Sequence, residues 1–356
     1  MKPNTFPKTA WPAEEGFSFP AEWERHHGIW LSWPHHLDTW PDCREEVLRD
    51  YALFVAAISR FEKVFLNHPP GQEVQVSAAL AQAGADLTAI RFHPHLSDDA
   101  WCRDHGPIFL KHATTGEVAI TDWEFNAWGG KFPSSLDNQI QDKIAAATGH
   151  RHFHLPYILE GGSIDTDGQG TLLTTRSCLL NQNRNHGLAH QELESVLQRG
   201  LGVRDIWWLD EGLEGDDTDG HIDDITRFAP EGVILTAWEE DPADPNHHAL
   251  ANNLRQLETW VRGSAHSHEI VRLPMPSRLD YKDQRLPASY ANFLVLNGAV
   301  LMPNFAQPGK DGEAAAILQK AFPKRKIVPV DSRIFVRESG ALHCLSQQEP
   351  ASGPQS

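Results

Sequence analysis

Cysteine is scarce in this sequence. The 356 residues include only four, at positions 43, 102, 178 and 344, and none forms a Cys-x-x-Cys pair. Because a disulfide framework or a structural zinc site needs paired or clustered cysteines, both are excluded. Unpaired thiols persist in a reducing compartment, so we expect a cytoplasmic protein in which one thiol could be catalytic.

Long apolar runs are missing as well. The N-terminus, Met-Lys-Pro-Asn-Thr-Phe-Pro, lacks the apolar stretch of a signal peptide. No segment approaches the roughly 20 apolar residues that a membrane span requires. We therefore expect no membrane partner.

Positive charge is the third shortage. Lys and Arg total 31 against 48 Asp and Glu, which gives a formal net charge of -17. Nucleic-acid binding requires basic patches that displace counterions from phosphates, so we expect no nucleic-acid partner. A small cationic substrate would instead be attracted.

Short apolar runs alternate with segments of helical periodicity along the whole chain. This alternation, without a Pro/Gly/Ser-rich linker, predicts one α/β domain over residues 1–356. About the first 10 and the last 6 residues are expected to be frayed, with the tail leaving the fold after Gln348. The predicted strands are 28–33, 63–66, 108–110, 171–174, 233–237, 293–296 and 299–302, and the predicted helices are 44–60, 190–199, 247–262 and 312–321.

Polar residues gather beside glycines in four segments, 101–107, 159–165, 215–224 and 340–348. Taken singly, the first could be an ordinary capped turn, and Cys344 in the last could be an inert core cysteine. The third segment packs five Asp and one His into ten residues, and that repulsion favours a bound cation. If 221–223 is extended, His221 and Asp223 share a face. Neighbours on a strand point to opposite faces, so the base for Cys344 should come from somewhere other than His343.

Taken together, these segments resemble the agmatine deiminase and bacterial peptidylarginine deiminase family of guanidine-modifying enzymes. The resemblance covers nearly the whole chain in the family's order. It rests on eight motifs: Pro-Ala-Glu-Trp-Glu (20–24) leading to Trp-Pro (33–34), Trp-Cys-Arg-Asp-His-Gly-Pro (101–107), Phe-Asn-Ala-Trp-Gly-Gly-Lys (125–131), Glu-Gly-Gly-Ser (160–163), Asn-Arg-Asn (183–185), Asp-Thr-Asp-Gly-His-Ile-Asp (217–223), Ser-Tyr-Ala-Asn-Phe (289–293) and His-Cys-Leu-Ser-Gln-Gln-Glu-Pro (343–350).

The resemblance implies a pentein fold, an α/β propeller of five pseudo-repeated ββαβ units around a central active site. It implies Cys344 as the nucleophile, His221 as the general acid and base, and no cofactor or metal. Asp104, Glu160 and Asp223 would hold the guanidinium, and Trp101, Asp217 and Asn292 would line the substrate site. Family members are often homo-oligomers, so a homo-oligomer is also implied.

The sequence departs from the family pattern at several places. Ser339-Gly340-Ala341-Leu342 replaces a common Gly-Gly-Gly-Asn-Ile run before His343. Cys102 and His105 flank Asp104 where Met and Thr or Ser are usual, and Arg176 replaces a frequent Glu. The catalytic positions are all retained. We therefore expect these departures to affect the shape of the loop beside the nucleophile and the choice of the substrate's tail, and to leave the reaction unchanged.

The chemistry suits a cysteine. A guanidinium carbon is a poor electrophile until carboxylates hold it, and thiolate attack would then give an amidino-thioether and ammonia. His221 would protonate the leaving nitrogen and later deprotonate water. Because carboxylates oppose ionisation of the nearby thiol, we predict that the substrate's positive charge lowers the pKa of Cys344 on binding.

Of three alternatives, two stay open and one is excluded. Asp219, His221 and Asp223 could be ligands of a manganese ureohydrolase, although the order of motifs and Cys344 argue against it. A zinc nucleobase deaminase is excluded, since no His-x-Glu is paired with Pro-Cys-x-x-Cys. A non-catalytic pentein binding module is opposed by the retained catalytic residues.

Among deiminase substrates, agmatine is favoured over free or peptidyl arginine. Asp217 and its acidic neighbours suit a cationic tail. Free arginine would need a partner for its carboxylate, which Arg103 or Arg184 could supply.

Overall fold

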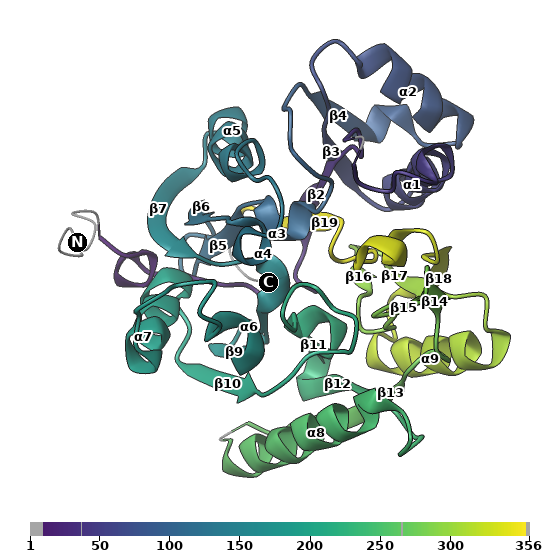
Figure 1. Ribbon diagram of the computed structural model, residues 1–356. Coiled ribbons are helices and arrows are strands. Elements are labelled where there is room, and N and C mark those ends of the chain that lie inside the picture. Colours follow the sequence, from purple (N-terminus) through teal and green to yellow (C-terminus); the bar gives the residue numbers. More distant parts are fainter. Residues whose placement is uncertain (1–9, 37, 265, 354–356) are drawn as a thin grey trace.

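The computed structural model describes residues 10–36, 38–264 and 266–353. It is a mixed α/β structure made of several small sheets, with the longer helices on the outside (Figure 1).

Five sheets share one plan. An antiparallel pair of strands is extended by a third strand that runs parallel to the inner one and is reached through a helix. A parallel neighbour requires such a crossover, because a tight turn reverses the chain. The sheets are β19-β2-β3-β4, β1-β5-β6-β7, β8-β9-β10, β11-β12-β13 and β16-β17-β18, and a small β14-β15 hairpin stands apart from them.

The strands are short. They are β1 (Phe17–Ser18), β2 (His26–Ser32), β3 (Lys63–Asn67), β4 (Ile90–His93), β5 (Ile108–His112), β6 (Val118–Glu124), β7 (Arg151–Ile158), β8 (Asp165–Thr166), β9 (Thr171–Thr175), β10 (Asp205–Leu209), β11 (Thr226–Ala229), β12 (Val233–Trp238), β13 (Glu269–Pro274), β14 (Asp280–Tyr281), β15 (Gln284–Arg285), β16 (Leu294–Val295), β17 (Ala299–Asn304), β18 (Lys326–Asp331) and β19 (Ser346–Pro350).

The crossover helices are longer than the remaining helical turns. The α-helices are α1 (Arg44–Ser59), α2 (Glu73–Gln82), α3 (Cys102–His105), α4 (Ala127–Gly130), α5 (Ile140–Thr148), α6 (Arg176–Leu179), α7 (His190–Leu201), α8 (Pro245–Gly263) and α9 (Pro308–Ala321). The 3-10 turns are η1 (Pro12–Glu15), η2 (Leu87–Ala89), η3 (Asp137–Gln139), η4 (Gly161–Ser163), η5 (Ile222–Asp224), η6 (Pro230–Gly232) and η7 (Phe335–Glu338).

All seven predicted strands and all four predicted helices are present, as β2, β3, β5, β9, β12, β16 and β17 and as α1, α7, α8 and α9. The predicted strand 293–296 is shortened to its two central residues. Helix α8 begins where Pro245 takes the first helical position and the side chain of Asp244 accepts the N–H of Asn246. Both features are typical of helix starts.

Strand β19 pairs antiparallel with β2, so a strand from near each end of the chain lies in one sheet. The tail predicted to fray after Gln348 instead continues this pairing to Pro350. Glu349 is buried, and its carboxylate accepts a 2.8 Å hydrogen bond from the indole of Trp30, which fastens the strand. The frayed ends predicted at residues 1–9 and 354–356 lie outside the described residues.

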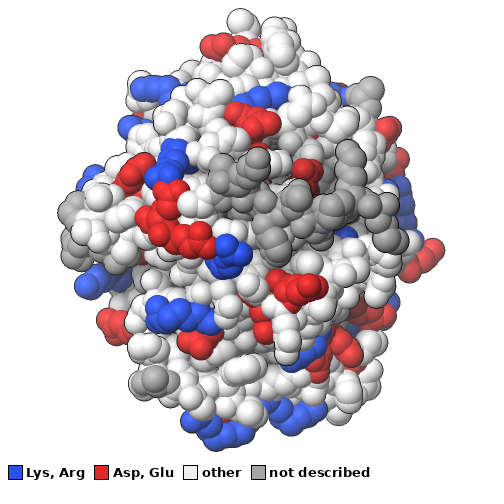
Figure 2. All heavy atoms as spheres, turned by 90° about the vertical axis from the view of Figure 1, so that its left-hand side faces the viewer, with Lys and Arg blue, Asp and Glu red and all other residues white. Residues whose placement is uncertain are grey.

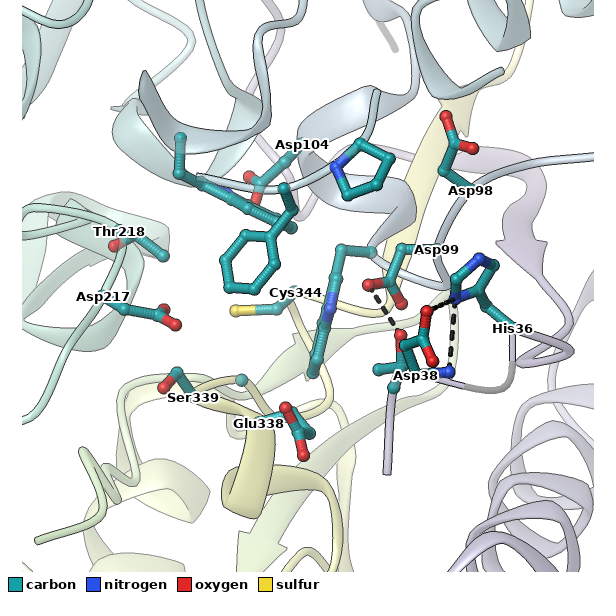
Figure 3. Close-up of a pocket in the computed structure, with 16 residues that line it drawn as sticks. His36, Asp38, Asp98, Asp99, Asp104, Asp217, Thr218, Glu338, Ser339 and Cys344 are labelled. Carbon is teal, nitrogen blue, oxygen red and sulfur yellow. Dashed lines mark hydrogen bonds and ion pairs between the residues drawn. The ribbon is translucent and has the colours of Figure 1, made fainter. Parts of the chain in front are cut away.

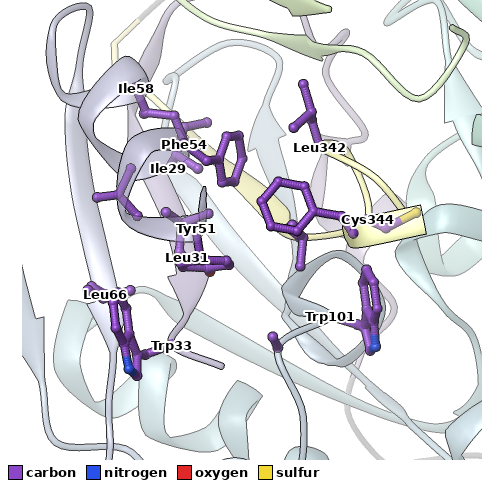
Figure 4. Close-up of a cluster of buried hydrophobic side chains, with 14 of the residues drawn as sticks. Ile29, Leu31, Trp33, Tyr51, Phe54, Ile58, Leu66, Trp101, Leu342 and Cys344 are labelled. Atoms are coloured by element: carbon purple, nitrogen blue, oxygen red, sulfur yellow. The ribbon is translucent and has the colours of Figure 1, made fainter. Parts of the chain in front are cut away.

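A large apolar cluster reaches from the sheet that contains β2 to the turn that contains Cys344 (Figure 4). Helix α1 packs Tyr51, Phe54 and Ile58 against the sheet, and Leu342 and Cys344 belong to the same cluster. The helical periodicity of residues 44–60 predicts one buried apolar stripe that includes Leu53, but Leu53 is 50% exposed. The stripe of α1 is therefore narrower than predicted, and the core that it builds backs directly onto Cys344.

Acidic and basic side chains are interspersed on the face shown in Figure 2, where Lys and Arg form no continuous patch outside the grey atoms. None of the helices in the described part of the chain combines the length and apolarity needed to cross a membrane.

Candidate active site

Cys344 lies in the turn between η7 and β19, and Asn292 orients it. The side-chain nitrogen of Asn292 donates to Sγ of Cys344 at 3.0 Å. The side-chain oxygen of Asn292 accepts the backbone N–H groups of His343 and Cys344 at 3.0 and 3.3 Å. Both Asn292 and Cys344 are buried. One amide thus fixes both the thiol and the backbone that carries it.

Carboxylates surround the thiol. Oδ2 of Asp223 lies 3.7 Å from Sγ of Cys344, and Oδ1 of Asp224 accepts from the amide of Asn292 at 3.0 Å. Burial, followed by the negative charges of Asp223, Asp224 and Asp104, raises the pKa of Cys344 well above its ordinary value. The expected opposition of the carboxylates to thiol ionisation is confirmed, and its reversal by a bound cation stays a prediction.

Asp104, on α3, is held by two donors. The indole of Trp128 donates to Oδ2 at 2.9 Å, and the backbone N–H of Gly162 donates to Oδ1 at 2.9 Å. Nδ1 of His221 lies 3.7 Å from the same Oδ1. Burial lowers the pKa of His221, but Asp104, followed by the neighbouring Cys178 and by Asp223, outweighs it, so the pKa is raised well above the ordinary value. The imidazolium form of His221 is therefore favoured.

Gly162 is required by this crowding. A Cβ at this position would lie 2.5 Å from Nδ1 of His221, 2.8 Å from Oδ1 of Asp104 and 3.2 Å from Oδ2 of Asp223. Any side chain would push these three groups apart. Gly162 therefore leaves the space in which the side chains of His221, Asp104 and Asp223 come together.

Glu160 is fully buried, and only one of its two carboxylate oxygens has a hydrogen-bond partner in the described chain. Its Oε1 accepts from Nε of Arg184 at 2.6 Å, whereas its Oε2 has no hydrogen-bond partner within the described chain. Oδ1 of Asp223 and both ring nitrogens of His221 also lack a protein hydrogen bond there. Buried polar atoms without partners are costly, so their gathering at one place indicates a site for a polar ligand.

A pocket opens above these groups (Figure 3). Figure 3 shows the sulfur of Cys344 between Asp217 on one side and Asp99 on the other. The lining residues are His36, Asp38, Thr39, Asp98, Asp99, Trp101, Asp104, Trp128, Phe132, Pro133, Asp217, Thr218, Glu338, Ser339, Gly340 and Cys344. Six are carboxylic acids, and no Lys or Arg is among the described residues of this lining. The charge of this lining therefore favours a positively charged ligand.

The predicted site residues form two layers. Trp101, Asp104, Asp217 and Cys344 line the pocket. Glu160, His221, Asp223 and Asn292 lie behind them, within the contacts described above. The structure thus brings the eight predicted positions to one place.

Three possibilities that the sequence left open are not met. The segment 221–223 is not extended, because Ile222–Asp224 form the 3-10 turn η5; His221 and Asp223 meet across Gly162 instead. Neither Arg103 nor Arg184 lines the pocket. Arg184 is committed to Glu160, Asp219 and the carbonyl of Thr218, and Arg103 bonds Gln347 and Gln348.

The possible manganese ligands Asp219, His221 and Asp223 do not point to a common position. Oδ2 of Asp219 accepts from Arg184 and Asn183, and Oδ1 of Asp219 pairs with Lys131. In the described chain, Asp219 shares no group of potential metal ligands with His221 or Asp223. The three residues therefore do not present a joint metal site.

His343 bonds carboxylates instead of the thiol. Its Nδ1 lies 2.7 Å from Oδ2 of Asp223, and its Nε2 lies 3.2 Å from Oε2 of Glu22. Glu22 also pairs with Arg227, whose guanidinium bonds Asp165. His343 thus holds the carboxylate beside Cys344 in place, as a residue one step removed from the nucleophile.

The departures near the nucleophile have local reasons. Ser339 adopts a left-handed conformation with φ of 65°, a position that favours glycine, and its side chain is close enough to Asp217 to favour the ionised carboxylate. Gly340 packs on the ring of Trp101, where a Cβ would approach within 2.3 Å. Arg176 forms an ordinary ion pair with Asp210. Cys102 and His105 are buried on α3, away from the pocket lining.

Sequence reasoning assigned no role to Glu22, Trp128, Cys178 or Asp224. Trp128 and Glu22 lie inside motifs that carried the resemblance, and Asp224 ends the acidic cluster. Their contacts join residues far apart in the chain, such as Glu22 with His343, so spacing alone could not reveal them.

Comparison with known proteins identifies the family of this chain. The family model for Porphyromonas-type peptidyl-arginine deiminase matches residues 18–350. An agmatine deiminase of Ectopseudomonas mendocina is 38% identical over 370 residues, which cover 96% of this chain and 98% of that protein. An agmatine deiminase of Pseudomonas aeruginosa is 38% identical over 368 residues, with the same coverage.

Solved structures give the same result. A substrate-bound agmatine deiminase of C. jejuni, in a cysteine-to-serine form, is 34% identical, with a TM-score of 0.86 over 94% of this chain and 97% of that chain. The agmatine deiminase of Enterococcus faecalis is 29% identical, with a TM-score of 0.88 over 97% and 98% of the two chains. The chain belongs to the Porphyromonas-type peptidyl-arginine deiminase family.

Proposed function

We propose that this chain is an agmatine deiminase, which hydrolyses the guanidinium group of agmatine to N-carbamoylputrescine and ammonia through a covalent intermediate on Cys344. The observation that carries the proposal is the buried Cys344 thiol among carboxylates, at the base of a pocket whose described lining contains acids and no Lys or Arg. The names of the relatives at 38% identity support the same activity.

Asp104, Glu160 and Asp223 hold the guanidinium. A planar guanidinium carries five N–H donors, and carboxylates in its plane accept them in pairs. Oε2 of Glu160 and Oδ1 of Asp223 lack protein hydrogen bonds, so they remain as acceptors for these donors. The bound cation offsets the mutual repulsion of the buried acids, and the acids neutralise the charge that opposes nucleophilic attack.

In the first half of the reaction, the substrate's charge lowers the pKa of Cys344, and the thiol loses its proton to solvent, from which the released ammonia later takes up one proton to become ammonium. The thiolate attacks the guanidinium carbon and forms a C–S bond. The imidazolium of His221 protonates one terminal nitrogen, whose C–N bond breaks to release ammonia. A positively charged amidino-thioether remains on Cys344, and His221 is left neutral.

In the second half, neutral His221 takes a proton from water as the oxygen adds to the same carbon. The tetrahedral adduct collapses with cleavage of the C–S bond, and the released thiolate recovers a proton. The balance is one guanidinium cation and one water converted into one urea group and one ammonium ion. His221 ends each cycle in the imidazolium form that begins the next.

The tail of agmatine ends in a second positive charge, which the acids of the outer pocket accept. Asp217 and Glu338 lie close enough for each other's charge to matter, since the negative charge of Asp217 contributes to the raised pKa of Glu338. Burial and the neighbouring Asp216 raise the pKa of Asp217 to about 6. An ammonium group stabilises both carboxylates, whereas the α-carboxylate of arginine would be repelled.

The same proposal covers the finer architecture. The five sheets of one plan are arranged as the units of a pentein propeller around the site, and the chain forms a single catalytic domain. The apolar cluster that joins α1 to Cys344 supports this unity. Four free cysteines fit a reducing cytoplasm.

Steady-state kinetics on agmatine, free arginine and a C-terminal arginyl peptide test the proposal. We expect ammonia release from agmatine with the highest kcat/KM, undiminished by a chelator, and its loss in Cys344→Ala. Mass spectrometry of the quenched wild type should detect an amidino adduct on the peptide that contains Cys344.

Other outcomes would replace the proposal. A higher kcat/KM for arginine or for the peptide would reassign the substrate. Urea release that depends on Mn²⁺ would support a ureohydrolase. Inactivity on every guanidine would favour a binding module, and full activity of Cys344→Ala would reject the nucleophile.

A further inference from the structure

Cys178 is a second buried cysteine at the catalytic centre, and the proposed reaction gives it no role. It lies on α6 and is fully buried. Thr175, the N-cap of α6, accepts the N–H of Cys178 at 3.3 Å and donates to the carbonyl of Gly220 at 2.6 Å. Gly220 precedes His221, so α6 is fastened to the segment that carries the proposed acid and base.

The thiol of Cys178 lies beside the imidazole of His221. The candidate ligand atoms of Glu160, Cys178 and His221 all lie within 4.8 Å of one another. His221 is fully buried, and neither of its ring nitrogens has a hydrogen-bond partner in the described chain. The Cys178 thiol is therefore a near neighbour of a ring whose nitrogens are unpartnered.

The other groups facing His221 are carboxylates. Asp104 approaches from α3, Glu160 from the start of η4, and Asp223 and Asp224 from η5. A carboxylate accepts hydrogen bonds and, once ionised, cannot donate one. It therefore favours imidazolium and leaves the acceptor nitrogen of neutral imidazole without a donor.

A thiol can do both, because S–H is a weak donor and sulfur is a weak acceptor. We propose that Cys178 is a positioning residue for His221, whose sulfur accepts from the imidazolium and whose S–H donates to the neutral ring. The ring would then keep one orientation while its proton leaves and returns. This inference rests on the proposed role of His221 as acid and base.

The surroundings keep Cys178 in the neutral form that this role requires. Burial, followed by the charge of Glu160, raises the pKa of the Cys178 thiol. An ionised thiolate would hold the imidazolium as firmly as a carboxylate does. The neutral thiol binds both forms weakly, and the imidazolium somewhat more firmly because a charged donor strengthens the bond, so neither form is trapped.

The test compares Cys178→Ala, which removes the partner, with Cys178→Ser, whose hydroxyl still donates and accepts. Cys43→Ala is the matched control, since Cys43 is buried at the start of α1. For each full-length protein we would measure kcat for agmatine against pH. We would also titrate the ring of His221 by NMR, with His221→Gln to assign its signal.

We expect Cys178→Ala to lower kcat about tenfold and to move the titration of His221 to lower pH, since a hydrogen bond that favours imidazolium is lost. Cys178→Ser should restore both, and Cys43→Ala should match the wild type. An unchanged titration and kcat in Cys178→Ala would overturn the inference. So would a folded Cys178→Ser as impaired as the alanine variant.

The titration also separates the two proposals. If the wild type fails to turn over any guanidine and Cys178→Ala still moves the His221 titration, the proposed function falls and the contact stands. If the wild type is active and the titration does not move, the role of Cys178 falls alone.

Discussion

Asn292 holds Cys344 from two directions: its side-chain nitrogen donates to Sγ at 3.0 Å, and its side-chain oxygen accepts the backbone N–H of Cys344 at 3.3 Å. The second hydrogen of the same amide goes to Asp224. Both the donor and the acceptor of the Asn292 side chain are thus hydrogen bonded to Cys344 and its neighbours. The position of the thiol depends on a side chain that takes no part in bond making.

Asn292→Ala should lower kcat by about 10- to 100-fold, because buried donors and acceptors lose a partner worth roughly 1–3 kcal/mol. Steady-state kinetics on agmatine measures this loss. Asn253→Ala is the control, since Asn253 is equally buried but bonds Asp210 and Glu211 beneath α8. Equal losses of kcat in the two variants would show that Asn292 acts only through stability.

The charge beside Cys344 predicts a thiol that is reluctant to ionise. Its pKa is raised, so thiolate absorbance in the free enzyme should appear only above the ordinary range of cysteine. A non-reactive guanidine should shift this titration to lower pH, and Asp223→Asn should shift it in the same direction without ligand. Cys344→Ala provides the baseline. A titration that does not respond to the guanidine would rule out substrate assistance.

Asp217 predicts a pH dependence of KM for agmatine. Its pKa is raised to about 6 before binding, and only the ionised carboxylate attracts the substrate's ammonium group. KM should therefore rise as pH falls through about 6, and Asp217→Asn should raise KM and flatten this rise. Butylguanidine, which lacks the ammonium group, is the matched substrate. The kcat/KM for butylguanidine should not change in Asp217→Asn. If it falls as much as the kcat/KM for agmatine, Asp217 does not act by binding the ammonium group.

Ser339 predicts a trade between stability and substrate binding. A left-handed backbone costs a non-glycine residue about 1–2 kcal/mol, and Ser339→Gly removes this strain. Glycine also loses more conformational entropy on folding, which offsets roughly 0.5–1 kcal/mol of the gain in stability. Ser339→Ala keeps the strain. Both variants remove the hydroxyl from Asp217 and should raise KM for agmatine. Urea unfolding should rank Gly above Ala by several tenths of a kcal/mol, and the reverse order would contradict the strain.

Glu22 predicts a loss of stability towards acid. Burial raises its pKa, but Arg227 and His343 overcome this and hold the pKa well below its ordinary value. The stabilisation is therefore complete above about pH 4.5 and is lost as pH falls below it. Glu22→Gln should lower the free energy of unfolding at pH 7 by about 3–5 kcal/mol, less so in acid. Glu45→Gln, on the exposed start of α1, should have no such effect.

Sequence signals are sufficient where they are local. Apolar runs such as that of β12 and the stripe of α1 predict their elements because burial on one or both faces leaves a regular pattern. Strand β7 has no continuous apolar run, because the exposed His152 and His154 alternate with the buried Phe153 and Leu155. Strand β18 contains apolar residues, but none of its residues is fully buried.

Motifs predict the membership of the candidate site, and its internal geometry needs the structure. Period-two reasoning places His221 and Asp223 on one strand face, but it cannot detect a 3-10 turn that begins immediately after His221. Arg103 and Arg184 resemble free cations because sequence does not show the distant partners that occupy them. Contacts between remote segments, such as Trp128 with Asp104, need the assembled sheets.

The pairing of β2 with β19 has a consequence for the making of the enzyme. Cys344 stands just ahead of β19, and the strand that anchors it is among the first to be synthesised. A nascent chain already carries the acids that attract a cation, yet it cannot fix the thiol until Pro350 has left the ribosome. A polypeptide that ends before Cys344 would lack both the proposed nucleophile and strand β19, which pairs with β2.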